Sequence, residues 1–239
     1  MPVKPVTDTD ATDTRHFTLG LPTAVYRALR SVAHAVNRGY LRVTVEGASV
    51  VPATGPVILA PVHRSNIDFL VASEVTTRKL FYMAKDTLWK RPRFGAFLES
   101  IGAFPVHREG ADRLALDRAQ DVLERGEALI LFPEGTRRSG PVVEELHEGA
   151  AFLAARTGAP IIPIGIGGSA AAMPKGSKMI RPVKIHVVVG QPLQAPARSA
   201  KGRVPRTQVH ALTEVLRAEL QALYDMAQKR VEDTAGRRR

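Results

Sequence analysis

Residues 57–69 read VILAPVHRSNIDF, an apolar run followed by a histidine, a polar turn and a second apolar pattern. Val57–Ala60 is short, continuous and apolar, as a buried strand is, and a helical pattern begins after the turn. His63 and Asp68 are five positions apart, so on one helix their side chains would point roughly 140° away from each other. The two can meet only where the chain bends. The stretch therefore predicts a strand, a turn and a helix.

This turn gives the histidine and the aspartate a chemical use. Ser65 or Asn66 is placed to cap the helix, which puts Asp68 in its first turn and leaves His63 at the end of the strand. A carboxylate that holds one ring nitrogen fixes the tautomer and makes the imidazole a better base for a hydroxyl that attacks a carbonyl. Turn amides nearby would stabilise the oxyanion. In the alternative interpretation His63 bonds a loop carbonyl and Asp68 only favours the helix dipole.

A second stretch has the character of an anion site. Residues 128–132 (ALILF) form an apolar run that ends abruptly at residues 133–140 (PEGTRRSG). Two arginines at a strand end match phosphate oxygens with their guanidinium groups, and Gly135 lets the main chain approach an anion closely. Glu134 would repel such a ligand unless it binds a hydroxyl or orients an arginine. The pattern therefore predicts a phosphate pocket in which Glu134 has one of these two roles.

Two further apolar segments complete the pattern. Residues 101–108 (IGAFPVHR) end in Arg108, which is either a third anion contact or a solvated strand-end residue. Residues 159–165 (APIIPIG) predict a buried strand whose prolines prevent regular ladder bonding on one side. We expect an edge strand there, with Ile162 and Pro163 beside an apolar acyl groove.

Strand patterns and helical patterns alternate through most of the chain. They predict an α/β fold: a single domain with a mostly parallel or mixed sheet of about seven strands flanked by helices. His63, Arg108 and Glu134 all follow predicted strands, so they should meet at the carboxyl edge of the sheet, where ligands bind. The predicted strands are residues 41–45, 57–60, 80–84, 104–106, 128–132, 161–165 and 183–189, and the predicted helices are near residues 67–77, 87–100, 111–124 and 148–156.

The ends of the chain differ from this core. We predict a mobile leader at residues 1–18, an amphipathic helix at 19–40, an α/β core at 41–204, and a helix with a basic tail at 205–239. The amphipathic helix either lies in a membrane interface or covers the protein's own core. Its apolar stripe consists of Leu21, Val25, Leu29, Val32 and Val36.

Composition narrows the class of protein. The chain has 239 residues, of which 44% are hydrophobic, and no cysteine, which excludes disulfides and an acyl-cysteine intermediate. A net charge of +11 suits an anionic membrane surface or the phosphates of coenzyme A. Only 5% of residues are aromatic, and no nucleic-acid motif is present, so nucleic acid is disfavoured. No metal-ligand spacing occurs. The uncharged stretch 157–174 is broken by prolines and glycines, so no bilayer span is expected.

With the four segments in this order, the chain resembles the glycerolipid acyltransferase family that includes the 1-acylglycerol-3-phosphate acyltransferases. The matching segments are His63 to Asp68, Gly102 to Arg108, Phe132 to Arg137, and Ile161 to Ile164. The resemblance implies transfer of a fatty acyl group from acyl-CoA or an acyl carrier protein thioester to a lysophospholipid hydroxyl, without cofactor or metal. It also implies a peripheral protein on the cytoplasmic face of the plasma membrane.

The same resemblance implies roles for single residues. His63 is the general base and Asp68 its orienter. The residues that would hold the phosphorylated acceptor are Arg108, Glu134, Gly135, Thr136 and Arg137. His107 stands where related sequences often have Asp or Asn, and Arg138 is an addition, so both departures lie in the acceptor region. Alternatives are another acceptor, such as glycerol-3-phosphate or a glycosylated phospholipid, and a non-catalytic protein that binds lipid phosphates.

Overall fold

A mixed sheet of seven strands, in the order β1-β7-β6-β2-β5-β3-β4, forms the centre of the protein. The computed structural model describes residues 23–107, 112–196 and 204–236. From β6 to β4 all neighbouring strands are parallel, whereas β7 is antiparallel to β6 and parallel to β1. The strands are β1 (Thr44–Glu46), β2 (Val57–Pro61), β3 (Leu80–Lys85), β4 (Ala103–Val106), β5 (Ala128–Ile130), β6 (Ile161–Gly167) and β7 (His186–Val189). The predicted α/β fold with a mixed sheet is confirmed.

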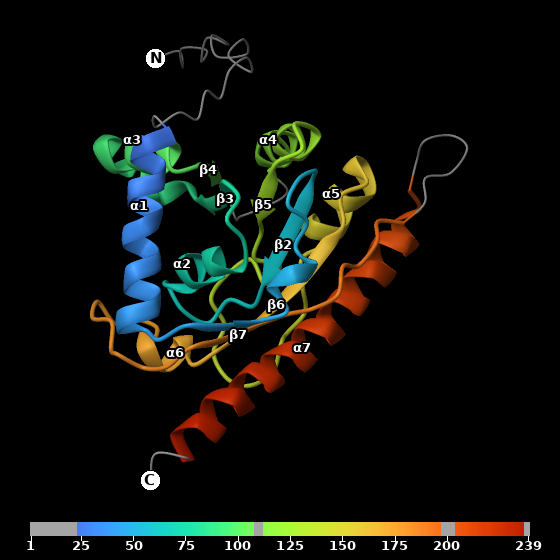
Figure 1. Ribbon diagram of the computed structural model, residues 1–239. Helices are drawn as coiled ribbons and strands as arrows, with labels where there is room; N and C mark the ends of the chain where they lie inside the picture. The colour runs from blue at the N-terminus through green and yellow to red at the C-terminus, as the bar shows by residue number, and fades with distance from the viewer. Residues whose placement is uncertain (1–22, 108–111, 197–203, 237–239) are drawn as a thin grey trace, which may run out of the picture.

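Two layers of helices enclose this sheet (Figure 1). The α-helices are α1 (Thr23–Ala35), α2 (Asp68–Ala72), α3 (Pro92–Ser100), α4 (Arg113–Glu124), α5 (Gly149–Thr157), α6 (Ser169–Ala172) and α7 (Arg206–Gly236). Shorter helical turns are η1 (Val36–Tyr40), η2 (Ala48–Val50), η3 (Ser73–Val75) and η4 (Asp86–Lys90). Helices α1, α2 and α3 lie on one side of the sheet, and α4, α5 and α7 on the other.

The order of the strands places a topological switch point, the position at which a binding crevice is expected, between β2 and β5. After β2 the chain crosses through α2 toward β3, whereas after β5 it crosses through α5 toward β6, in the opposite direction. The two connections therefore leave the sheet on opposite faces. Ligands of open α/β sheets bind at such a point. The motif that follows β2 and the motif that follows β5 therefore face each other.

The expected edge strand at residues 159–165 is wrong, because β6 lies inside the sheet between β2 and β7. Its prolines are accommodated without a free edge. The carbonyl of Pro163 accepts a hydrogen bond from Gly190 N (2.9 Å), beyond the last residue of β7, and Ile161 exchanges main-chain bonds with Leu193. Pro163 thus lies just beyond the part of β6 that pairs with β7, so the N–H group that proline lacks is not needed for this pairing.

Helix α7 lies directly on the main chain of β6. A Cβ atom on Gly165 would lie 2.2 Å from the carbonyl oxygen of Leu223, and one on Gly167 would lie 2.4 Å from that of Ala227. No residue larger than glycine fits at either place. The glycines of this segment therefore bring helix and strand into contact. The strand was predicted to end at residue 165, but β6 continues to Gly167.

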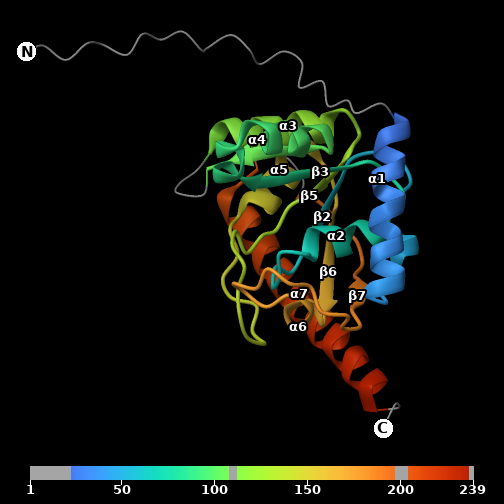
Figure 2. The ribbon, with the colours of Figure 1, turned by 90° about the vertical axis from the view of Figure 1, so that its left-hand side faces the viewer.

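Helix α1 shows its apolar stripe to solvent. Val25, Leu29, Val32 and Val36 are 42%, 37%, 63% and 36% exposed. The face that contacts the protein is polar, and α1 stands at the outside of its layer beside α2 (Figure 2). The interpretation in which this stripe covers the protein's own core is therefore wrong. Within the described residues, no helix is both long and apolar enough to cross a bilayer.

Candidate active site

The turn after β2 brings His63 and Asp68 together. Nδ1 of His63 lies 3.1 Å from Oδ2 of Asp68, the first residue of α2. The carboxylate is fully buried, and the His63 side chain is 12% exposed. Because an ionised carboxylate only accepts hydrogen bonds, Nδ1 carries the proton and Nε2 is left as the basic nitrogen. The geometry expected of a strand, turn and helix is present.

Asp68 also organises the turn itself. Its Oδ2 accepts hydrogen bonds from the main-chain N–H groups of Arg64 and Ser65, both at 2.6 Å. The expected cap by Ser65 or Asn66 is wrong: α2 has no side-chain cap, and Ser65 Oγ donates to the carbonyl of Met173 (2.8 Å). The amides of Arg64 and Ser65 are therefore bound to Asp68 and are not directed at a reacting oxyanion.

The segment after β5 holds the main chain and the ring of His63. Glu134 Oε1 accepts a hydrogen bond from His63 N (2.8 Å), and Arg138 N donates to His63 O (2.9 Å). The Phe132 ring stacks on the imidazole, with centroids 4.2 Å apart and planes inclined by 29°. His63 is thus fixed by its two main-chain groups, by Asp68 and by an aromatic face.

A buried ion pair joins the two motifs. Arg64 Nη1 donates to Glu134 Oε1 (2.7 Å) and Oε2 (2.5 Å), and both side chains are almost completely buried. Nη2 of Arg64 donates a hydrogen bond to the carbonyl of Val142 (3.1 Å), and the guanidinium carbon lies 4.9 Å from the ring centroid of Tyr224 on α7. Of the two roles predicted for Glu134, orienting an arginine is the one that its contacts match. The sequence reasoning missed Arg64, because the pairing requires that β2 and β5 be neighbours.

The other residues of the third segment lie around this pair. Gly135 has φ +66°, and a Cβ there would lie 2.6 Å from Nε2 of His147, so glycine is required for local packing. Thr136 is exposed and Arg137 is half-buried. Within the described ranges Arg137 has no hydrogen bond or ion pair, so its guanidinium is free for a ligand. Arg138 pairs with Glu144 (2.9 Å).

Three predicted residues are not seen in contact with His63 or Glu134: Arg108, Ile162 and Pro163. Arg108 is outside the described residues; its neighbour His107 pairs with Asp86 (2.8 Å) at the end of β4, two strands from β5. Ile162 is fully buried in the core and Pro163 is buried beside it. Their role in an acyl groove stays a prediction.

Comparisons with known proteins agree with this geometry. The sequence profile of the Acyltransferase family matches residues 42–167. The 1-acyl-sn-glycerol-3-phosphate acyltransferase of Bacillus subtilis is 28% identical over 72% of this chain and 83% of its own length. The chloroplastic enzyme of the same name from Arabidopsis thaliana, LPAT1, is 25% identical over 64% of this chain, which spans only 44% of that longer protein.

A solved structure shares the fold. The crystal structure of the 1-acyl-sn-glycerophosphate acyltransferase PlsC from Thermotoga maritima aligns with a TM-score of 0.66, over 89% of this chain and 80% of that one. The sequence identity is 22%, so this likeness concerns the fold alone.

Proposed function

Because this chain belongs to the Acyltransferase family, we propose that it transfers a fatty acyl group from a thioester to the free hydroxyl of 1-acylglycerol-3-phosphate, giving phosphatidic acid. The names of its relatives support this acceptor. The observation that carries the proposal is the His63–Asp68 pair, whose Nε2 is left basic at the crevice between β2 and β5. The acyl donor is acyl-CoA or an acyl carrier protein, and no further cofactor takes part.

The reaction follows from this pair. The acceptor hydroxyl binds with its proton toward Nε2 of His63, and the imidazole removes this proton as the oxygen attacks the thioester carbonyl. The C–O bond forms, the C–S bond breaks, and the sulfur leaves with the bonding electrons and takes up the proton from the imidazolium. Asp68 stabilises the imidazolium and keeps the ring in place, as in other histidine–carboxylate pairs. A separate nucleophile is not needed.

Arg137 binds the phosphate of the acceptor in this proposal. Its half-buried, unpaired guanidinium follows β5 directly, in the same segment that holds His63 through Glu134 and Arg138. A guanidinium binds phosphate oxygens through a planar pair of N–H donors. Gly135 and Thr136, next to Arg137 in the same segment, complete this binding region in the proposal. The predicted contact of Arg108, which lies outside the described residues, stays a prediction. The distance between phosphate and base then selects which hydroxyl of the acceptor reacts.

A panel of acceptors tests the proposal with release of free thiol as the readout. With one acyl-CoA, we expect 1-acylglycerol-3-phosphate to be preferred over monoacylglycerol, glycerol-3-phosphate and a glycosylated phospholipid. In Arg137→Ala this preference over the phosphate-free acceptor should fall by about 10–100-fold, because one charge-assisted contact contributes ~1.5–3 kcal/mol. Ser139→Ala, an exposed neighbour, is the matched control. Thiol release mainly with glycerol-3-phosphate or a glycosylated phospholipid would favour an acyltransferase with a different acceptor. Lipid binding without any thiol release would favour a non-catalytic protein that binds lipid phosphates.

We also propose that the protein docks peripherally on the anionic cytoplasmic face of the plasma membrane through α1. The support is the exposed apolar stripe on a helix whose polar face contacts the protein. The net charge of +11 favours anionic lipid. This arrangement brings a lipid acceptor to the protein.

Substitution of a single stripe residue should weaken vesicle binding. Val32→Asp is expected to reduce association with anionic vesicles by at least tenfold in a flotation assay, because it places a charge where docking would bury the exposed side chain of Val32 in the membrane interface. Leu114→Asp is the control, since Leu114 is 52% exposed on α4, across the sheet from α1. Equal loss in both variants would contradict docking through α1.

A further inference from the structure

The polar face of α1 contacts the segment that contains Asp68. Helix α2 begins at Asp68 and continues without a break into η3, which ends at Val75. Contacts from α1 and η1 reach the carboxyl end of this segment, at the opposite end from the catalytic carboxylate. Figure 1 shows α1 beside α2 along this layer.

Arg30 binds three carbonyl groups around the end of this segment. Its Nη2 donates to Ser73 O (3.0 Å) and to Thr76 O, and its Nη1 donates to Arg78 O (2.9 Å). The last carbonyls of a helix have no partner within the helix and carry partial negative charge. A guanidinium placed there satisfies them and fixes the direction in which the chain leaves. Arg30 therefore caps the α2–η3 segment from a different helix.

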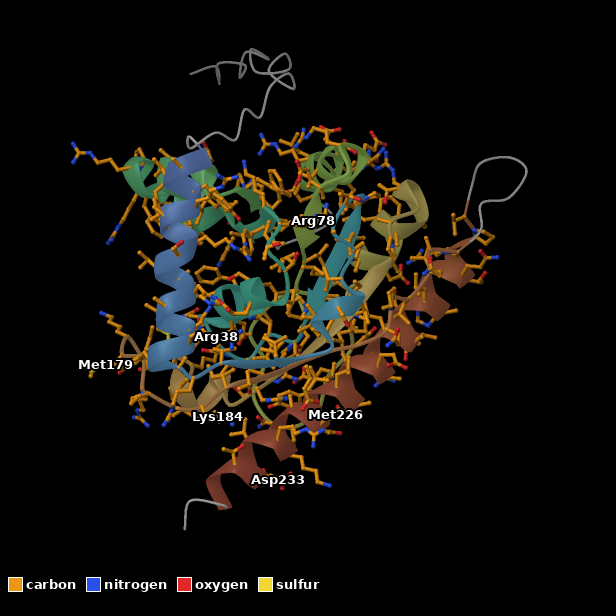
Figure 3. All side chains as sticks on the ribbon, viewed as in Figure 1. Arg38, Arg78, Met179, Lys184, Met226 and Asp233 are labelled. Carbon is orange, nitrogen blue, oxygen red and sulfur yellow. The ribbon has the colours of Figure 1, made fainter. Side chains whose placement is uncertain are left out.

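Glu74 of η3 is held by the same helix. Its Oε1 accepts from Asn37 Nδ2 (2.9 Å), and its Oε2 lies 2.7 Å from His34 Nδ1 and 3.8 Å from Arg38 Nε. Asn37 is fully buried, and its Nδ2 also donates to Leu70 O (3.0 Å) in α2. Two residues that take part in these contacts, Arg38 and Arg78, are labelled in Figure 3. A carboxylate that is 5% exposed is thus bound entirely by α1 and η1.

The stretch from Asp68 to Val75 is uninterrupted helical backbone, so a displacement of Glu74 would be passed along it toward Asp68. We infer that Arg30, Asn37 and Glu74 are positioning residues, which hold α2 so that Asp68 stays within hydrogen-bond distance of His63. We name these three residues the α1 clamp. The inference rests on the proposed function for its kinetic test alone.

The kinetic test compares two arginines on one helix, with the acceptor dispersed in detergent so that vesicle docking does not enter. Arg30→Ala and Glu74→Ala are expected to lower kcat by about 10–100-fold, because small misplacements of catalytic groups have effects of this size. The KM for the acceptor should change by less than about threefold. Arg30→Lys should restore kcat only in part, since one ammonium cannot span three carbonyls. Arg27→Ala removes an equal charge from the exposed face of α1 and should leave kcat unchanged.

A double-mutant cycle separates positioning from general damage to the fold. If the α1 clamp acts through Asp68, Glu74→Ala should have less than about a twofold effect in the Asp68→Ala background. The inference would be overturned if Glu74→Ala lowered kcat equally in both backgrounds. It would also be overturned if the variants raised only the KM for the acceptor. So would a loss in Arg27→Ala as large as that in Arg30→Ala.

A second readout does not depend on catalysis. In NMR spectra of histidine-labelled protein, the Nδ1 proton of His63 should be shifted downfield by its bond to Asp68, and His63→Ala identifies its signal. We expect Arg30→Ala to move or broaden this signal and Arg27→Ala to leave it in place. An unmoved signal in Arg30→Ala would refute the inference. If the signal moves but wild-type protein transfers no acyl group, the clamp stands and the proposed function fails.

Discussion

Replacement of His63 by alanine is expected to lower the rate of acyl transfer by about 10²–10⁴, because the attacking hydroxyl loses the base that removes its proton. The KM for the acceptor should change little, since the phosphate contacts are untouched. Release of free thiol from acyl-CoA, followed with purified protein and 1-acylglycerol-3-phosphate, measures the effect. No other described histidine can replace the base, because the ring bound to Asp68 is that of His63.

Two further variants make this result specific. His63→Gln fills more of the space against Phe132 and should be as inactive as His63→Ala, because an amide is not a base at neutral pH. His210→Ala is the control, since His210 is an exposed residue of α7 that pairs only with Glu148 (3.4 Å). Near-normal transfer by His63→Ala would end the assignment of this residue as the base.

The second large effect is expected at Glu134, where stability and activity should fall together. Glu134→Ala leaves Arg64 buried without its counter-charge and His63 N without its acceptor. Removal of one partner from a buried ion pair costs about 3–5 kcal/mol. We therefore expect the free energy of unfolding, measured by urea denaturation, to decrease by about this amount. Transfer should be strongly reduced even at temperatures where the variant is folded.

Two comparisons test the cause. Glu144→Ala breaks the exposed pair with Arg138 and should change the free energy of unfolding by less than about 1 kcal/mol. The double variant Arg64→Met, Glu134→Leu should recover most of the stability, because an apolar pair of similar volume can replace a buried ion pair. It should not recover transfer, since His63 N still lacks its acceptor. A loss below about 1 kcal/mol in Glu134→Ala would contradict the role of this pair.

The parts of the fold that depend on local sequence could be predicted. Each of the seven predicted strands overlaps an observed one, because short apolar runs between turns leave the chain few alternatives; the weakest agreement is at β1, which begins at Thr44 where the prediction began at residue 41. The contact of His63 with Asp68 was accessible for the same reason: both residues lie within a single turn. Ser65 was misassigned as the cap because its hydroxyl bonds Met173, a residue distant in sequence.

The features that could not be predicted depend on contacts between segments that are far apart in the chain. Arg64 and Glu134 meet only because β2 lies beside β5, and the sequence contains no signal for this order. Prolines in β6 indicated an edge, yet the ladder of β7 ends just where Pro163 lacks its donor. The periodicity of α1 located its apolar stripe correctly but not the side that faces the protein. That choice is made by Arg30 and by Asn37 of η1, which bond main-chain carbonyls and the Glu74 carboxylate.

The pairing of β1 with β7 determines when the chain can complete its fold during synthesis. Thr44 of β1 lies opposite His186, so the first strand has no partner until 142 further residues have been made. At a ribosomal rate of roughly 5–20 residues per second, this interval is about 7–28 seconds. Helix α1 precedes β1 and emerges before it. Under the docking proposal, a nascent chain would offer the exposed apolar stripe of α1 to a bilayer before the sheet closes, so delivery to the membrane would precede completion of the active site.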